Sequence, residues 1–188
     1  MTCIAGLVEA NGRVWIGGDS AGSNQYQLTV RRDPKVFRVG DILFGTAGSF
    51  RMAQLLRCTF MPPPHPDGMD TERYLVKVFI DAVRQLFKDA GAAKAVNEQE
   101  QGNYFLLGYR RQLWRVEPDY QVGQALEGYD AVGTGAEVAF GALYVLQHGG
   151  APSLTPRDKI RLTLEAAEQW QPAVRRPFTI DALEPEQA

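Results

Sequence analysis

Thr2 is the residue of this chain whose position could make it a nucleophile. It follows Met1 and opens an apolar, β-prone run, residues 2–8. If Met1 is removed, Thr2 carries a hydroxyl and, on the same residue, an α-amine that can act as its base. The reference pKa of an α-amine is about 8, close to working pH, so a modest perturbation makes it an effective base. Because many proteins begin with Met-Thr, this position predicts acyl-transfer chemistry only if the chain also supplies partners for Thr2.

Three positions downstream could supply those partners: Asp19 after two glycines, Lys35, and Gly45 within the stretch Phe-Gly-Thr-Ala-Gly at 44–48. A nearby ammonium favours a neutral amine and a developing alkoxide, and a buried carboxylate can hold that ammonium in place. A glycine N–H can bind the oxyanion of a tetrahedral intermediate. Each residue also has an ordinary interpretation: a turn aspartate, a solvated lysine, and a glycine needed only for backbone geometry.

The first 47 residues predict two consecutive β-hairpins. Asn11-Gly12 and Gly40-Asp41 are turn signals between apolar or alternating runs. The expected strands span residues 2–8, 13–19, 35–39 and 42–47. Residues 20–27 are small and polar, and we expect them to form a loop.

Two helices are expected after these hairpins. Ser49 is a candidate N-cap for a helix that ends at about residue 59, and an amphipathic helix follows over about 70–89. The proline-rich segment 61–68 between them is expected to be extended. Residues 90–102 are expected to form a loop.

The second half of the sequence repeats the order of strands followed by two helices. The expected elements are strands at 103–109 and 112–116, short strands within 119–132, helices at 136–148 and 155–170, and a strand at 178–180. Each pair of helices can cover the outer face of one sheet. We therefore predict an α+β fold, a four-layer αββα sandwich with two mainly antiparallel sheets between two helix layers. Residues 1–183 are assigned to a single domain and residues 184–188 to a mobile C-terminal tail.

Composition narrows the class of protein. The chain has 188 residues, of which 45% are hydrophobic, and this length and composition favour one globular domain. Its formal net charge of −2 disfavours a general nucleic-acid binder. The sequence has neither a signal-peptide pattern nor an apolar run long enough to cross a membrane, so we expect a cytoplasmic protein without membrane association. The two cysteines and two histidines make no zinc pattern. We expect no cofactor and no metal.

Taken together, the motifs resemble the proteasome β-subunit family, and within it the bacterial ring peptidase HslV. The resemblance rests on Thr2, on Gly-Gly-Asp at 17–19, on Lys35 and the strand residues after it, on the 44–48 stretch, and on Gly-Thr-Gly at 133–135. It implies the N-terminal nucleophile (Ntn) hydrolase fold and a threonine-type endopeptidase. It also implies polypeptide substrates, a homo-oligomeric ring, and the option of an ATPase unfoldase as partner. The implied site residues are Thr2, Asp19, Lys35, Gly45 and Thr134, the last supplying a supporting hydroxyl. Without the resemblance, the sequence predicts only that Thr134 caps the following helix.

The sequence departs from the family pattern after the last helix. Active members carry an acid and a small hydroxyl residue there, whereas this chain reads Glu-Gln-Trp-Gln-Pro-Ala-Val-Arg-Arg at 168–176. Glu168 is the candidate acid. The alternative is a non-catalytic ring subunit of the same fold that retains Met1. A different Ntn amidohydrolase is disfavoured because such enzymes often begin with cysteine, and Cys3 comes one residue too late.

Overall fold

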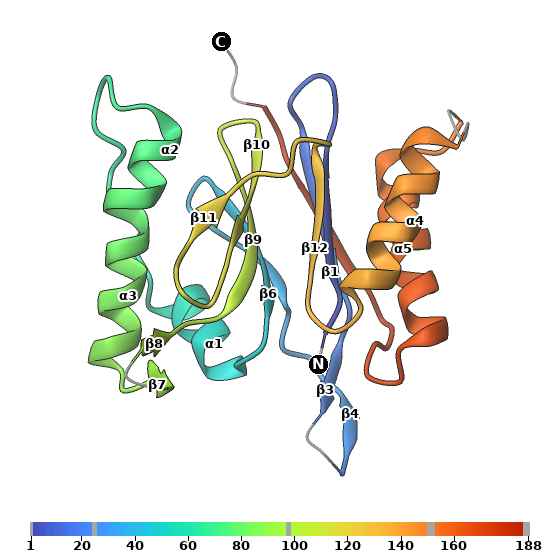
Figure 1. Cartoon of the computed structure of the whole chain (residues 1–188), viewed down its shortest axis with the longest axis horizontal. Helices are drawn as coiled ribbons and strands as arrows, with labels where there is room; N and C mark the ends of the chain where they lie inside the picture. Colours follow the sequence, from blue (N-terminus) through green and yellow to red (C-terminus); the bar gives the residue numbers. More distant parts are fainter. Residues whose placement is uncertain (1, 24–25, 97–98, 150–152, 186–188) are drawn as a thin grey trace.

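The computed structural model describes residues 2–23, 26–96, 99–149 and 153–185. Two antiparallel sheets lie face to face, and helices cover the outer face of each (Figure 1). This is the predicted four-layer αββα sandwich. Met1 and residues 186–188 of the predicted tail lie outside the described residues.

The first sheet carries the N-terminal end of the chain. Its strands lie in the order β12-β1-β2-β13, with bounds β1 (Ile4–Val8), β2 (Val14–Gly18), β12 (Tyr129–Val132) and β13 (Thr179–Leu183). In the register, Ile4 lies opposite both Gly18 and Val132. The residues just before β1, just after β2 and just after β12 therefore meet at one end of this sheet.

The second sheet brings in the two remaining predicted positions. Its strands lie in the order β11-β10-β9-β6-β5, with bounds β5 (Val36–Val39), β6 (Ile42–Ala47), β9 (Tyr104–Tyr109), β10 (Gln112–Val116) and β11 (Val122–Gly123). Val36 lies opposite Gly45, and the Thr46 N–H donates to the Lys35 carbonyl (2.8 Å). Lys35 thus precedes β5 beside the end of β6.

Helices cover the outer face of each sheet (Figure 1). The second sheet packs against α1 (Phe50–Cys58) and against a second, longer helix. That longer helix is the predicted 70–89 helix and consists of α2 (Thr71–Tyr74), the π-helical η1 (Leu75–Phe79) and α3 (Ile80–Asp89). The first sheet packs against α4 (Ala136–His148) and α5 (Pro156–Trp170). The predicted caps are present: Ser49 accepts from the Met52 N–H, and Thr155 accepts from the Asp158 N–H.

Three apolar layers hold these elements together. One is rich in aromatic side chains and lies between the second sheet and α1–α3, and another lies between the first sheet and α4–α5. The third, between the two sheets, includes Ile4, Ile16 and Leu43. Burial of this layer fixes the spacing of the sheets and so fixes where residues from different sheets meet.

Two short hairpins replace predicted loops. Segment 20–27 contains β3 (Ala21–Ser23), which pairs with β4 (Leu28–Val30), and segment 90–102 contains β7 (Lys94–Val96) paired with β8 (Gln99–Gln101). Residues of β4 are exposed. The strands of both hairpins are only three residues long, and Ala-Gly-Ser at β3 has no alternating apolar pattern, so periodicity did not reveal them.

Candidate active site

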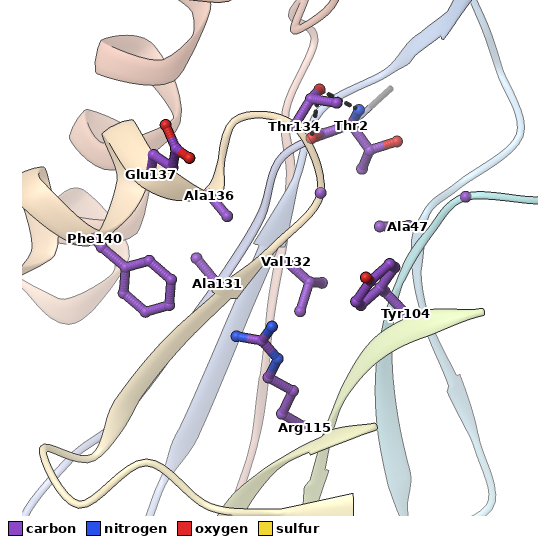
Figure 2. A pocket seen from close by; sticks show the side chains of 12 residues that line it. Thr2, Ala47, Tyr104, Arg115, Ala131, Val132, Thr134, Ala136, Glu137 and Phe140 are labelled. Atoms are coloured by element: carbon purple, nitrogen blue, oxygen red, sulfur yellow. Dashed lines mark hydrogen bonds between the residues drawn. The ribbon is translucent and has the colours of Figure 1, made fainter. Parts of the chain in front are cut away.

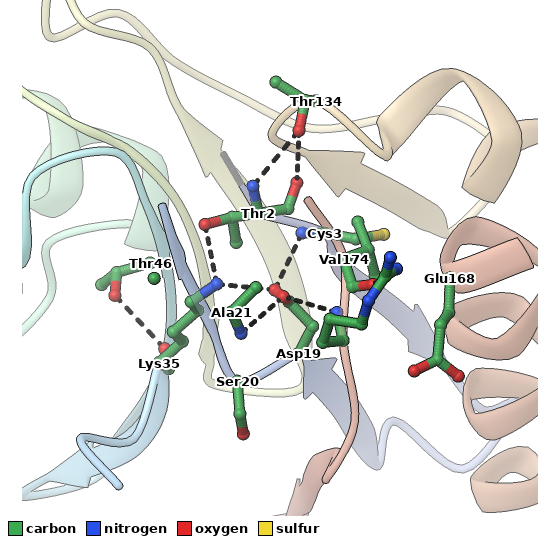
Figure 3. A network of polar contacts seen from close by, with 12 residues as sticks. Thr2, Cys3, Asp19, Ser20, Ala21, Lys35, Thr46, Thr134, Glu168 and Val174 are labelled. Atoms are coloured by element: carbon green, nitrogen blue, oxygen red, sulfur yellow. Dashed lines mark hydrogen bonds and ion pairs between the residues drawn. The ribbon is translucent and has the colours of Figure 1, made fainter. Parts of the chain in front are cut away.

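Thr2 lies at the end of the first sheet, beneath the turn that follows β12 (Figure 3). Its backbone nitrogen lies 3.3 Å from the Thr134 hydroxyl oxygen, which also donates to the Thr2 carbonyl (3.4 Å). The Gly135 N–H donates to the same carbonyl (3.1 Å). Only 3% of Thr2 is exposed, so the turn holds this residue in a sheltered position.

Lys35 bridges the two sheets at this point. Its ammonium donates to the Thr2 hydroxyl (2.9 Å) and to Asp19 Oδ1 (2.7 Å). The side chains of Lys35 and Asp19 are almost completely buried. A buried ammonium in contact with the hydroxyl oxygen is placed to stabilise an alkoxide at that atom.

The Asp19 carboxylate is held by four donors. Besides Lys35, Oδ1 accepts from the Cys3 N–H (3.1 Å), and Oδ2 accepts from the N–H groups of Ala21 (2.9 Å) and Arg175 (3.2 Å). Both oxygens are therefore occupied by donors. This satisfies a buried charge and fixes the direction in which Lys35 extends.

Burial sets the protonation balance of the site. It lowers the pKa of Lys35 below the ordinary value for lysine, while the neighbouring Asp19 opposes that shift. Burial also raises the pKa of Cys3 to about 12, so this thiol stays protonated. Cys3 is thus an unreactive buried side chain beside the site.

The structure does not bring the Gly45 N–H to Thr2. Successive N–H groups of a strand point to opposite sides, and that of Thr46 points to β5, so the Gly45 N–H points to β9, opposite Leu106. A Cβ at Gly45 would lie 2.5 Å from Ile4 and 2.6 Å from Ile16. Gly45 therefore provides space for the close approach of the two sheets.

Gly48, three residues later, lies closer to the side chains of Thr2 and Lys35. It lines a small recess together with Thr2 and Lys35, and its φ of +112° favours glycine. Within the described residues, the Gly48 N–H donates no hydrogen bond. The sequence signal was present, because Gly48 belongs to the same Phe-Gly-Thr-Ala-Gly stretch, but the strand boundary decides which glycine N–H is available.

Thr134 does not act as the helix cap of the ordinary interpretation. The cap position of α4 belongs to Gly135, without a side-chain hydrogen bond, while the Thr134 hydroxyl binds Thr2. Gly133 permits this approach because its φ is +98° and a Cβ there would lie 2.3 Å from the Thr2 carbonyl oxygen.

Glu168 lies apart from the group formed by Thr2, Lys35 and Asp19 (Figure 3). Its carboxylate accepts from the Arg176 N–H (2.9 Å) and from the Arg176 side chain (2.8 Å to Nε). These bonds hold the pKa of Glu168 below its usual value. The expectation that this carboxylate brackets the Thr2 amine therefore finds no support in the geometry.

A cleft of about 470 Å³ opens beside Thr2 (Figure 2). One side is formed by the end of β12 and the start of α4, and the other side by the end of β6, the start of β9 and β10. Its residues are Thr2, Ala47, Gly48, Tyr104, Arg115, Ala131, Val132, Gly133, Thr134, Ala136, Glu137 and Phe140. A cleft of this size is large enough to bind a ligand, and a ligand bound there would lie beside Thr2.

Two further observations concern the described part of the chain. It contains no group of three or more His, Cys, Asp or Glu residues arranged to hold a metal ion. Its helices are all too short or too polar to cross a membrane.

Comparison with known proteins gives a clear result for structure and none for sequence. Neither a protein-family model nor a curated protein matches the sequence. Among solved structures, BPH of Thiobacillus denitrificans superposes with a TM-score of 0.77 at 22% identity, over 97% of this chain and 100% of that one. BPH is also known in complex with epoxomicin. Eukaryotic HslV from Trypanosoma brucei superposes with a TM-score of 0.69 at 16% identity, over 97% and 99%.

A third match is Anbu from Pseudomonas aeruginosa, solved as a helical assembly. Its TM-score is 0.67 at 15% identity, over 97% of this chain and 80% of that one. All three matches cover nearly the whole of this chain at low identity, so they identify the fold. The chain has the αββα fold of these three solved structures.

Proposed function

We propose that this chain is a threonine-type endopeptidase in which Thr2, exposed by removal of Met1, is the nucleophile. The observation that carries the proposal is the buried Lys35 ammonium, which contacts both the Thr2 hydroxyl (2.9 Å) and Asp19 (2.7 Å). A subunit with a purely structural role has no need for a buried lysine directed at the hydroxyl of its second residue. Burying such a pair costs free energy that only partly returns as Coulomb attraction.

The reaction follows from the positions of these groups. Thr2 Oγ attacks the carbonyl carbon of a peptide bond, and its proton passes to the α-amine of the same residue. Lys35 stabilises the alkoxide, and Asp19 positions Lys35. The Gly48 N–H takes the oxyanion role that the sequence suggested for Gly45. The α-amine then protonates the departing peptide amine, which leaves an ester on Thr2 that water hydrolyses.

Assembly into a homo-oligomeric ring is part of the proposal. Support comes from the helical assembly of the Anbu neighbour and from large apolar side chains exposed on this chain, among them Tyr26, Leu126 and Trp170. A cytoplasmic location and an ATPase unfoldase that delivers polypeptides are consistent with such an assembly. Light scattering tests the assembly, and a stable monomer at micromolar concentration would contradict it.

The activity is tested by peptide hydrolysis on protein whose intact mass shows loss of Met1. Thr2→Ala removes the nucleophile, so cleavage of short fluorogenic peptides should fall to background. Thr2→Ser keeps a hydroxyl and an α-amine and should retain part of the rate. Equal rates for wild type and Thr2→Ala would refute the proposal.

One observation favours the non-catalytic ring subunit as the second candidate. Glu168, the only acid that the sequence offered for the Thr2 amine, is bound to Arg176 instead. An intact mass that includes Met1 in the natural protein would favour this candidate, because Thr2 would then have no free amine.

A further inference from the structure

Two hollows of very different size flank Thr2. The cleft on the side of Thr134 measures about 470 Å³. The recess on the side of Lys35 and Phe50 measures about 10 Å³, roughly the room of one water molecule. The ring of Phe50 helps to close this recess and is itself covered by the Arg31 guanidinium, 4.6 Å from the ring centre.

The position of the Thr2 nitrogen shows which side of a scissile bond each hollow would hold. When the tetrahedral intermediate collapses, the departing amine takes its proton from this nitrogen and must approach it closely. The nitrogen lies 3.3 Å from Thr134 Oγ, at the wall of the large cleft (Figure 2). The leaving-group side of the substrate therefore faces the large cleft, and the acyl side faces Lys35 and Gly48.

The walls of the large cleft are mainly apolar. Val132, Ala136 and Phe140 line it on one side, and Ala47 and Tyr104 line it on the other (Figure 2). Such walls gain free energy by removing apolar substrate surface from water.

The charges in the cleft do not favour an acidic ligand. Arg115 is already paired with Glu117 (2.6 Å) and with Asp130 (3.4 Å), so its charge is compensated within the protein. Glu137 adds an exposed negative charge to the lining. A neutral apolar side chain fits this environment better than a carboxylate.

We propose that the large cleft binds the side chain of the substrate residue immediately C-terminal to the scissile bond and selects a bulky apolar one. The proposal rests on the peptidase activity proposed above. It makes Ala136 and Phe140 specificity-determining residues, since both line the cleft from α4 without taking part in the Thr2–Lys35–Asp19 hydrogen bonds.

The test uses internally quenched peptides that differ only in the residue after the cleavage point, which is Phe, Leu, Ala or Asp. Mass spectrometry locates the cleaved bond, and kcat/KM is compared within the series. For wild-type protein lacking Met1, Phe and Leu should exceed Ala by about tenfold or more, in line with burial of a large apolar side chain, and Asp should be the slowest.

Variants on one helix provide the matched comparison. Ala136→Leu fills the cleft and Phe140→Ala removes a wall, so each should reduce the Phe-to-Ala ratio severalfold. Tyr144→Ala truncates an aromatic residue of the same helix that is exposed and does not line the cleft, so it should leave the ratio unchanged.

A second measurement probes the cleft without a substrate that spans both sides of Thr2. Phenylalaninamide and alaninamide are added to compete with water for the Thr2 ester. The amine attacks the ester carbonyl, an amide forms, and Thr2 Oγ leaves and recovers a proton. Phenylalaninamide should capture the acyl group more efficiently, and Ala136→Leu should abolish the difference. Activity without selectivity in both measurements would overturn the cleft proposal alone, whereas absence of Thr2-dependent activity on every peptide would overturn the peptidase proposal with it.

Discussion

Asp19 and Glu168 receive similar hydrogen bonds but have opposite surroundings. Asp19 accepts from the Arg175 N–H, and Glu168 accepts from the N–H of the next residue, Arg176. The cation beside Asp19 is Lys35, which is buried, whereas the cation beside Glu168 is Arg176, whose side chain is 63% exposed. The two carboxylates therefore differ in their cations: the Lys35 ammonium is desolvated and directed at the Thr2 hydroxyl, whereas the Arg176 guanidinium is screened by solvent.

The largest effect is expected from Asp19→Asn. Both Asp19 oxygens accept hydrogen bonds, so the side-chain NH₂ of the substituted asparagine would have to face another donor. The substitution also removes the negative charge that pairs with Lys35. We expect a loss of about 3–5 kcal/mol in the free energy of unfolding and at least about a hundredfold loss in kcat/KM. Urea unfolding and peptide hydrolysis measure the two effects. Near-wild-type behaviour in both would remove the distinction between the two carboxylates.

Lys35→Met should separate stability from activity. Asp19 keeps the N–H groups of Cys3, Ala21 and Arg175, so the loss in unfolding free energy should be smaller than for Asp19→Asn, about 1–3 kcal/mol. Activity should still fall at least about a hundredfold because the alkoxide loses its cation. A destabilisation larger than that of Asp19→Asn would show that Lys35, and not the backbone, holds the carboxylate.

The pH dependence of kcat/KM should report the lowered pKa of Lys35. The rate rises as the Thr2 amine loses its proton, with a reference pKa of about 8, and falls when Lys35 becomes neutral. Because burial lowers the pKa of Lys35, the alkaline fall should begin below the value of about 10.4 for an exposed lysine. The same shift affects stability. At pH values between the lowered pKa of Lys35 in the folded state and its ordinary pKa in the unfolded state, the unfolded chain binds more protons, so the stability of wild type relative to Lys35→Met increases as pH rises. A rate that keeps rising past pH 10.5 would exclude a role for the Lys35 ammonium.

Thr134→Val should have an intermediate effect. It removes the hydroxyl that lies 3.3 Å from the Thr2 nitrogen but leaves the Gly135 N–H bond to the Thr2 carbonyl. We expect about a tenfold loss in kcat/KM, consistent with one hydrogen bond, and Thr134→Ser should restore most of the rate. If Thr134→Ser is as slow as Thr134→Val, the loss comes from altered packing and not from the hydroxyl.

The smallest effect is expected from Glu168→Gln, which is also the control for Asp19→Asn. Activity should stay within about twofold of wild type, and Tm should fall by at most roughly 3 °C. Since the pKa of Glu168 lies below its usual value, the stability advantage of wild type exists above about pH 4.5 and disappears as pH falls through the lowered pKa. A hundredfold loss in kcat/KM would place Glu168 in the site after all.

Most of the architecture could be predicted from local sequence. Turn signals at Asn11-Gly12 and Gly40-Asp41, strand periodicity and the caps Ser49 and Thr155 predicted elements that the structure contains. The β3–β4 and β7–β8 hairpins were not predicted, because strands of three residues are too short to show an alternating apolar pattern and are held by backbone pairing.

The sequence by itself determined which groups the site contains: a hydroxyl and a potential amine at Thr2, a carboxylate at Asp19, an ammonium at Lys35 and a second hydroxyl at Thr134. Only the tertiary structure decided which of them meet. Gly45 lies within the β6–β9 ladder and Gly48 lies beyond its end, so the extent of the ladder determines which glycine N–H it leaves unpaired. The position of Glu168 depends on the chain after α5, which brings Arg176 into contact with it. The large cleft is likewise formed by parts of the chain that are far apart in sequence: Thr2, β6, the β9–β10 hairpin and the β12–α4 segment. Residue types are local properties of the chain, but hydrogen-bond availability and cavities arise from the packing of distant segments.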